Sequence, residues 1–393
     1  MSAAPDPPDP QDAHQPVEPI ATDSPLEGPS PGVALCLSGG GFRAMLFHAG
    51  ALMRLNELGL LQDIERISSV SGGSITAAVL GLNWEKLDFD SATKVGRKFA
   101  EVVVSPLRKF AERKIDIPSI LKGIFLPGRI SERVASAYRD HLFGKATLRD
   151  LPDRPRFVIN ASNVQSKALW RFSKPYMWDY RVGKIEKPMT ELAVAVAASS
   201  AFPPVLSPVV LKHKETDYVP NTGLDLQRSP FTTNVVLTDG GVYDNLGLET
   251  AWKRYQTIWV SDAGGMYSPE ANPKNDWYNH TRRIFDLIDN QVRSLRKRQL
   301  MDSYKQDQRK GAYWGIWTDI EDYKLGTNAL ACPVDKTREI ASVSTRLTKL
   351  DPATQERIIN WGYAVCDAAM RKYGGVDAKL KPDNFPYPKA GVG

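Results

Sequence analysis

The chain has 393 residues, with an apolar share of 42% and a charged share of 24%, values typical of a globular protein with room for one large domain or two ordinary ones. It contains no run of about eighteen apolar residues and no basic-then-apolar N-terminal pattern, so we expect neither a transmembrane helix nor a secretory signal. The three cysteines are not spaced as metal ligands and indicate a reducing cytoplasm, so we expect no metal and no cofactor.

Residues 1–31 differ in composition from the rest of the chain. They contain nine prolines, six acidic residues and no lysine or arginine. Such a segment buries too little apolar surface to offset its chain entropy, so we predict a disordered tail before a folded domain at 32–393. The whole chain carries 51 − 45 = +6 and the tail 0 − 6 = −6, which leaves +12 on the domain. The domain is therefore suited to an anionic partner.

The domain opens with a predicted strand at 33–37 and a helix at 42–58, joined by a glycine-rich loop that contains Gly39, Gly40 and Gly41. Consecutive glycines leave backbone N–H groups uncovered near a helix N-terminus, where partial positive charge gathers. The loop therefore suits an anion, which is either a phosphate or the oxyanion of an acyl-transfer intermediate.

The residues that follow the glycines, Arg43 and Ala44, help to decide between a phosphate and an oxyanion as the anion of this loop. Ala44 occupies the last glycine position of the G-x-G-x-x-G pattern, and no Gly-Lys-Ser/Thr follows, so neither common nucleotide-binding pattern is met. Arg43 falls in the first helical turn. It would brace the loop, attract a lipid phosphate or simply face solvent.

A second turn follows the predicted strand at 67–70. Its sequence indicates a sharp strand–turn–helix elbow, with Ser71 at the apex and Gly72 and Gly73 after it. An elbow of this kind strains the apical residue and lifts its hydroxyl clear of the sheet, and the glycines supply clearance. Ser69 stands where the usual G-x-S-x-G pattern has its first glycine. With this elbow downstream, an oxyanion hole becomes the better interpretation of the glycine loop.

Residues 83–150 are predicted to form a helical insertion that caps the site. A basic cluster in this insertion is interleaved with apolar residues such as Phe99 and Phe110. The cluster comprises Lys94, Arg97, Lys98, Arg108, Lys109, Arg113 and Lys114. Such a mixture indicates contact with an anionic membrane surface over about 94–122, or an ordinary helix pair that covers the sheet.

Further along the chain, Asp239 follows a predicted strand at 235–238 and precedes Gly240 and Gly241. Open α/β sheets place their sites at such strand ends. Asp262 has a similar setting one strand later and is the serious competitor for the same role. Between the two turns, the aromatic residues Trp170, Tyr176, Trp178 and Tyr180 indicate an antiparallel hairpin or a substrate-lining loop.

Together these elements predict an α/β fold with a mainly parallel central sheet and helices on both faces. Predicted strands at 33–37, 67–70, 157–160, 235–238 and 258–261 alternate with helices at 42–58, 74–82, 189–198 and 352–373. A further helix is predicted at about 276–302, and we interpret its basic cluster at 293–310 as a solvated face. Residues 276–393 are expected to be a C-terminal helical extension.

Three motifs in this order resemble the patatin-like phospholipase family, in its bacterial form. The chain carries Gly39-Gly40-Gly41-Phe42-Arg43, then Ser69-Val70-Ser71-Gly72-Gly73, then Asp239-Gly240-Gly241. A segment at 198–204, Ala-Ser-Ser-Ala-Phe-Pro-Pro, resembles the stretch that precedes the aspartate in the family. The resemblance covers 34–265 and departs from the family pattern at Ser69 and Ala44.

The resemblance implies an α/β/α fold and a Ser–Asp dyad in place of a triad. It implies that Ser71 is the nucleophile and Asp239 the base, and that Gly39–Gly41 form the oxyanion loop. It also implies that Arg43 is an anion-assisting cation and that Gly72–Gly73 are the elbow glycines. Histidine usage agrees, because only His280 follows Asp239 and it leads into a charged helix. His48 lies two turns into the first helix and is interpreted as a packing residue.

The resemblance implies a lipid acyl hydrolase whose substrate is a phospholipid or lysophospholipid. The alternative is a non-enzymatic protein of the same fold that holds a phosphate or lipid headgroup on the glycine loop. We expect a cytoplasmic protein that visits the inner membrane surface, with no nucleic-acid partner because no such module is present.

Overall fold

The computed structural model describes residues 29–113, 129–203, 205–266 and 269–393. Most of the predicted tail, at 1–28, and the middle of the insertion, at 114–128, lie outside the described residues, as do 204 and 267–268.

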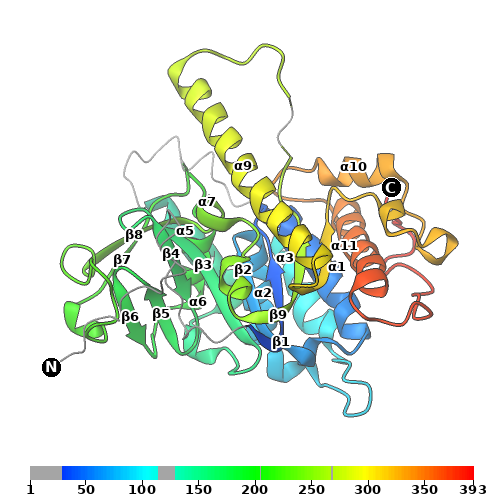
Figure 1. Cartoon of the computed structure of the whole chain (residues 1–393), viewed down its shortest axis with the longest axis horizontal. Coiled ribbons are helices and arrows are strands. Elements are labelled where there is room, and N and C mark those ends of the chain that lie inside the picture. Colours follow the sequence, from blue (N-terminus) through cyan, green and yellow to red (C-terminus); the bar gives the residue numbers. More distant parts are fainter. Residues whose placement is uncertain (1–28, 114–128, 204, 267–268) are drawn as a thin grey trace.

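In the described residues, ten strands form one mixed sheet (Figure 1). Five parallel strands lie in the order β10-β9-β1-β2-β3, and antiparallel strands continue the sheet through β4, β5 and β6, with β7 and β8 as a branch beside β3. The strands are β1 (Ser30–Leu37), β2 (Ile64–Val70), β3 (Arg156–Asn163), β4 (Ala168–Phe172), β5 (Tyr176–Asp179), β6 (Gly183–Glu186), β7 (Val209–Lys212), β8 (Asn234–Asp239), β9 (Tyr255–Asp262) and β10 (Lys310–Gly315). The predicted aromatic hairpin is β4–β5.

One edge of β3 is shared by two strands that run toward each other. Val70 at the end of β2 pairs with Asn160, and Asp239 at the end of β8 pairs with the next residue, Ala161. The opposite edge of β3 pairs with β4 at both positions. The carboxyl ends of β2 and β8 therefore meet head to head on one edge.

Helices cover both faces of the sheet, as the sequence predicts. The helices are α1 (Gly41–Glu57), α2 (Gly72–Leu82), α3 (Ser105–Ala111), α5 (Arg129–Tyr138), α6 (Leu192–Ser199), α7 (Gly241–Asp244), α8 (Glu249–Trp252), α9 (Trp277–Lys305), α10 (Val334–Ala341) and α11 (Pro352–Tyr373). Side chains alternate across a strand, so Leu35 and Leu37 of β1 join the large core with α1 and α11. Ala34 and Cys36 join a smaller core on the other face with α8 and Leu300 of α9.

Three residues of the basic cluster in the insertion form ion pairs within the fold. Lys94 pairs with Asp63 at 2.7 Å, Arg97 with Asp88 at 3.1 Å, and Arg108 with Glu356 at 2.7 Å. The interleaved Phe99 and Phe110 are buried. Of the two interpretations, the described part of 94–122 fits helices that cover the core. Membrane contact there remains a prediction.

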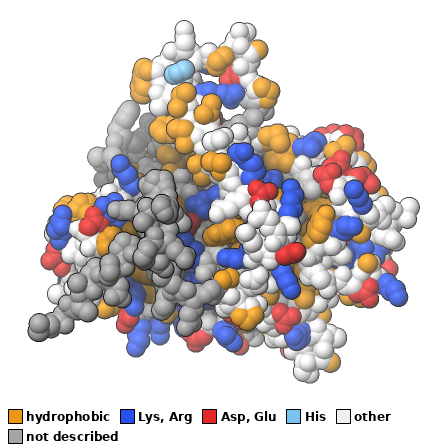
Figure 2. Space-filling model, viewed as in Figure 1, with side chains coloured by type: hydrophobic (Ala, Val, Ile, Leu, Met, Phe, Trp, Pro, Cys, Tyr) orange, Lys and Arg blue, Asp and Glu red, His pale blue; other side chains and the backbone are white. Residues whose placement is uncertain are grey.

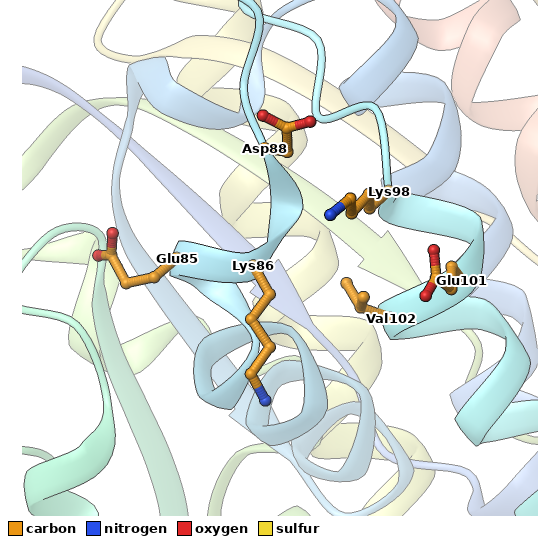
Figure 3. A pocket seen from close by; sticks show the side chains of 6 residues that line it. All are labelled: Glu85, Lys86, Asp88, Lys98, Glu101 and Val102. Carbon is orange, nitrogen blue, oxygen red and sulfur yellow. The ribbon is translucent and has the colours of Figure 1, made fainter.

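A surface pocket of about 480 Å³ lies on this side of the molecule (Figure 3). It is lined by Glu85, Lys86, Asp88, Lys98, Glu101 and Val102. None of the predicted site residues borders it, and its charges are mixed. In the part of the chain that the structure describes, no helix is long and apolar enough to cross a membrane.

Two glycines allow α1 and α11 to cross closely. A Cβ atom on Gly362 would lie 2.0 Å from the carbonyl oxygen of Phe47, and one on Gly50 would lie 2.0 Å from that of Ile359. Real Cβ atoms do not approach backbone oxygens this closely. Any side chain at either position would therefore push the two helices apart.

We therefore expect Gly362→Ala to lower the free energy of unfolding by about 2–3 kcal/mol, the cost of overpacking a rigid contact. Arg357→Ala, at an exposed position of the same helix, is the control and should change it by about 0.5 kcal/mol or less. Urea unfolding followed by circular dichroism measures both. Equal stability of the Gly362 variant and the wild type would contradict the close crossing.

Candidate active site

Ser71 occupies a strained elbow between β2 and α2. Its backbone has φ 51° and ψ −119°, a conformation that is costly for a residue with a side chain. Gly73 makes room for the turn, because a Cβ there would lie 2.5 Å from the carbonyl oxygen of Leu37. The Ser71 side chain is almost buried, with 9% of the residue exposed.

Three serine hydroxyls support this elbow from behind. The Ser71 amide donates to the Ser199 hydroxyl at 3.0 Å, which is 2.9 Å from the Ser74 hydroxyl. Ser74 in turn donates to Ser69 at 3.0 Å. Ser69, which departs from the usual glycine, is therefore part of a polar chain beneath the turn. The sequence analysis includes Ser199 in the segment at 198–204 but assigns no role to it or to Ser74, because neither residue carries a signal for a contact beneath the elbow.

Asp239 lies beside Ser71 because β2 and β8 meet on the edge of β3. The Ser71 hydroxyl is near enough to its carboxylate to lower the pKa of that group, and the Gly241 amide donates to the same carboxylate at 2.7 Å. The main chain of Asp239 is held on both sides, by Ala201 at 3.0 Å and by the Ser162 hydroxyl at 2.8 Å. Burial raises the pKa of Asp239 to about 7, although the Gly241 amide and the Ser71 hydroxyl lower it.

The glycine loop lies directly against the elbow. A Cβ on Gly39 would lie 3.1 Å from the Ser71 Cβ, and one on Gly72 would lie 2.2 Å from the Gly41 carbonyl oxygen. Gly40 and Gly41 have φ values of 143° and 60°, which side chains disfavour. The sequence-predicted loop, elbow and aspartate are thus brought together in one place.

The amides of the loop are not equivalent. The Gly39 amide donates to the Asn245 carbonyl oxygen at 3.1 Å, so it already has an acceptor. Within the described residues, no acceptor binds the amides of Gly40 or Gly41. These two N–H groups, at the start of α1, are the ones available to an anion. Of the three predicted donors, Gly39 is therefore the least suited.

Asn245 is a neighbour of the site that sequence reasoning missed. Its side-chain oxygen would lie 2.4 Å from a Cβ on Gly39 and 2.6 Å from one on Gly241. Its side chain therefore fills the space between the oxyanion loop and the Asp239 turn. The only local signal was its position six residues after Asp239, at the end of α7.

Arg43 points into the protein and not toward a substrate. One of its nitrogens donates to the Ala263 carbonyl oxygen at 2.8 Å, and the other to the carbonyl oxygens of Val343, at 2.9 Å, and Ala341. The residue is 2% exposed, and burial lowers its pKa to about 10. Of the three roles considered from the sequence, these contacts fit bracing of the loop.

The C-terminal extension forms one wall of the site. The Phe42 amide donates to the Arg346 carbonyl oxygen at 3.3 Å, and a Cβ on Gly41 would lie 2.0 Å from the Thr345 carbonyl oxygen. Residues 341–346 therefore cover the glycine loop. No feature of the sequence indicated this contact, which spans about three quarters of the chain.

His48 supports the loop from below, in agreement with its interpretation as a packing residue. Its Nε2 donates to the Ser38 carbonyl oxygen at 2.9 Å, because a carbonyl only accepts, and its Nδ1 then accepts from the Ser261 hydroxyl at 2.8 Å. Burial lowers its pKa to about 4, so the ring is neutral. His280 is exposed near the start of α9.

Asp262, the competing aspartate, is occupied by other partners. It accepts from the Tyr313 hydroxyl at 2.7 Å and the Gly264 amide at 2.9 Å. Arg293 of α9 lies 3.6 Å away. Burial would raise the pKa of Asp262, but the charges of Arg293 and Lys297 lower it below its usual range. This carboxylate is held as an anion among cations.

The interpretation of the α9 cations as a solvated face is wrong for two of them. Arg293 pairs with Asp262, and Arg296 lies 3.1 Å from Glu249 and 3.6 Å from Asp244. The helical period turns both residues toward the sheet, on the side where Leu300 enters the smaller core.

If Arg43 braces the loop, Arg43→Lys should lower the free energy of unfolding by about 2–4 kcal/mol, because one ammonium cannot reach three separated carbonyls. Urea unfolding measures this change. A variant of unchanged stability, with weaker binding only of substrates that carry a phosphate, would instead support the anion-assisting role.

The chain is similar in sequence or in structure to several known proteins. A patatin-like phospholipase domain-containing protein of Aspergillus niger is 27% identical over 187 residues, which are 47% of this chain and 22% of that protein. Human GIVD cytosolic phospholipase A2, solved with methyl gamma-linolenyl fluorophosphonate, matches at 14% identity with a TM-score of 0.46, over 86% of this chain and 57% of that one. VipD from Legionella pneumophila matches at 15% identity with a TM-score of 0.36, over 87% of this chain and 67% of that one.

The chain thus spans about a fifth of the fungal relative and little more than half of the human structure. The bacterial form of the family stays a prediction. The family model for patatin-like phospholipases matches residues 35–252, more than half of the chain, and includes the glycine loop, the elbow and the Asp239 turn. The chain belongs to the patatin-like phospholipase family.

Proposed function

We propose that the protein is a lipid acyl hydrolase that uses a Ser71–Asp239 dyad on phospholipid or lysophospholipid esters. The observation that carries this proposal is the meeting of a strained elbow serine and a buried aspartate at the joined ends of β2 and β8, next to two unused amides. Membership of the family supports an acyl hydrolase in general. The dyad, the substrate and a place of action at the cytoplasmic surface of a membrane are our proposals.

In the first half-reaction, the Ser71 Oγ attacks the carbonyl carbon of the ester while Asp239 accepts the hydroxyl proton. The carbonyl oxygen becomes an oxyanion, which the amides of Gly40 and Gly41 stabilise. Collapse of this intermediate breaks the ester C–O bond. The leaving alcohol takes the proton from Asp239, and the acyl group remains on Ser71.

In the second half-reaction, water attacks the acyl-enzyme and gives its proton to Asp239. The second oxyanion forms in the same hole, and its collapse releases the fatty acid and returns the proton to Ser71. A carboxyl group with a pKa of about 7 is suited to both transfers, because its proton affinity is matched to neutral pH.

We expect Ser71→Ala and Asp239→Asn each to reduce ester hydrolysis by at least about 1,000-fold, because each removes one half of the dyad. Turnover of p-nitrophenyl butyrate and of phosphatidylcholine, with Ser91→Ala as an exposed serine control away from the site, measures this effect. Full activity of Ser71→Ala would contradict the dyad. If the wild type is inactive on all esters but binds phosphate or lipid headgroups, the protein is instead a binder of the same fold.

The raised pKa of Asp239 predicts the pH profile. Below about pH 7 the carboxyl group is protonated and cannot accept the Ser71 proton, so kcat/KM should fall about tenfold per pH unit toward acid and level off above pH 7. Initial rates on a soluble ester at constant ionic strength test this. A flat profile between pH 5 and pH 8 would contradict Asp239 as the base.

A further inference from the structure

Helix α9 carries large apolar side chains that the fold leaves exposed. Trp277 is 81% exposed, Phe285 65% and Leu287 64%. The other exposed apolar residues of the helix are Tyr278, Ile284, Ile288 and Leu295. Figure 1 shows the N-terminal part of α9 standing away from the body, and Figure 2 shows apolar side chains gathered along that projection. We call residues 277–295 the α9 arm.

The arm is anchored at its far end. Leu300 is fully buried in the smaller core, and Tyr304 donates to the Ile258 carbonyl oxygen at 2.5 Å. The helix therefore holds its apolar arm out from the body on a fixed base.

The apolar face of the arm is wide. At about 100° per residue, its exposed apolar side chains cover roughly half of the helix circumference, and the charged residues Arg283, Asp286 and Asp289 fall on the other half. A partner helix in a coiled coil would need only a narrow seam. A face this broad, with Trp277 and Tyr278 at its outer end, matches a helix that lies in the surface of a lipid layer.

The arm also lies next to the candidate active site. Arg293 pairs with Asp262 and donates to the Gly265 carbonyl oxygen. Arg296, just beyond the arm, pairs with Asp244 of α7, a helix that begins two residues after Asp239. The charge of Asp289 adds to the raised pKa of Asp239, so the arm is within electrostatic range of the base.

Exposed apolar side chains also stand on the loops that carry the site. Phe202 is 58% exposed and follows Ala201, whose carbonyl oxygen binds the Asp239 amide. Val242 is 53% exposed in α7, and Met266 is 56% exposed next to Gly265. The end of the sheet that holds Ser71 is therefore edged by apolar groups, as a surface that faces lipid would be.

We propose that the α9 arm enters the surface of a phospholipid layer and holds the mouth of the Ser71 site against it. This proposal rests on the proposed lipid hydrolase function, because it supplies the surface from which that site draws its substrate. It differs from the membrane contact predicted for 94–122, which depends on charge and is weakened by salt. Insertion of apolar side chains is driven by the hydrophobic effect, so it persists at high salt.

The test uses the full chain and a triple variant of the arm, Trp277→Glu/Phe285→Glu/Leu287→Glu. The control, Val164→Glu/Leu224→Glu/Leu380→Glu, changes exposed apolar residues that lie on other elements. Co-sedimentation with vesicles of phosphatidylcholine and phosphatidylglycerol, at low and high salt, measures binding. Hydrolysis of the vesicle phospholipid and of soluble p-nitrophenyl butyrate measures activity at and away from a surface.

We expect vesicle binding by the arm variant to be weaker by on the order of 100-fold at both salt concentrations. The reason is that three large apolar side chains can no longer transfer from water into the lipid layer. Vesicle hydrolysis should fall in parallel while hydrolysis of the soluble ester is retained, which also shows that the variant is folded. The control variant should behave as the wild type. An arm variant that binds vesicles as well as the wild type would overturn the proposal.

Two further outcomes distinguish failure of the hydrolase proposal from failure of the lipid-binding proposal for the arm. If the wild type hydrolyses no ester but binds vesicles through the arm, the hydrolase proposal fails and the lipid surface stands. If the wild type ignores vesicles and is a dimer in sedimentation, while the arm variant is a monomer, a second copy of the chain covers the arm and the lipid proposal is overturned.

Discussion

The meeting of β2 and β8 on one edge of β3 is the constraint on which the site depends. Their last residues pair with Asn160 and Ala161, which are neighbours, so the two strands end against each other with no residue to spare. The chain must therefore turn away from the edge of β3 after β2 and after β8. The turn after β8 leaves no room for a side chain at Gly240. A Cβ on Gly240 would lie 2.3 Å from the Asn160 carbonyl oxygen. The Ser71 hydroxyl lowers the pKa of the Asp239 carboxylate because both residues lie at this junction.

Several polar side chains around the junction already bind partners inside the protein, although Arg43 Nε and Asn160 Oδ1 have none among the described residues. Arg43, His48 and Ser199 each bind main-chain or hydroxyl groups that fix the glycine loop and the elbow. The cations Arg293 and Lys297 lower the pKa of Asp262 and keep it an anion. The groups that shift the pKa of Asp239 include no cation, and burial raises it. Two carboxylates at the ends of β8 and β9, which are consecutive strands in the chain, thus have opposite pKa shifts. The one whose proton affinity is matched to neutral pH lies beside the serine.

Much of the fold could be predicted because its signals are local. Helix α11 begins and ends at the predicted residues, where Pro352 suits a first helical position and Gly374 follows the end. The elbow and the Asp239 turn were also found from short patterns of strand, small residues and helix. The antiparallel branch of β7 and β8 was not, since pairing between distant strands leaves little trace in either strand alone.

The contacts of the buried arginine side chains could not be predicted either, because they also depend on segments that are distant in the sequence. Arg43 turns toward residues 341–343, and Arg296 turns toward Asp244, and each choice depends on segments that are far away in the sequence. Likewise, Gly39 was grouped with Gly40 and Gly41 because the sequence cannot show that Asn245 already accepts from its amide. A glycine run indicates where an anion fits, and tertiary contacts decide which amides remain for it.

The central claim is that Asp239 activates Ser71 directly, and covalent labelling tests it most directly. A fluorophosphonate probe reacts only with an activated serine, and peptide mass spectrometry locates the labelled residue. The account predicts a label on Ser71 in the wild type and its loss in Asp239→Asn, with both proteins folded by circular dichroism. A label on another serine, or labelling of Ser71 at an unchanged rate in Asp239→Asn, would contradict it.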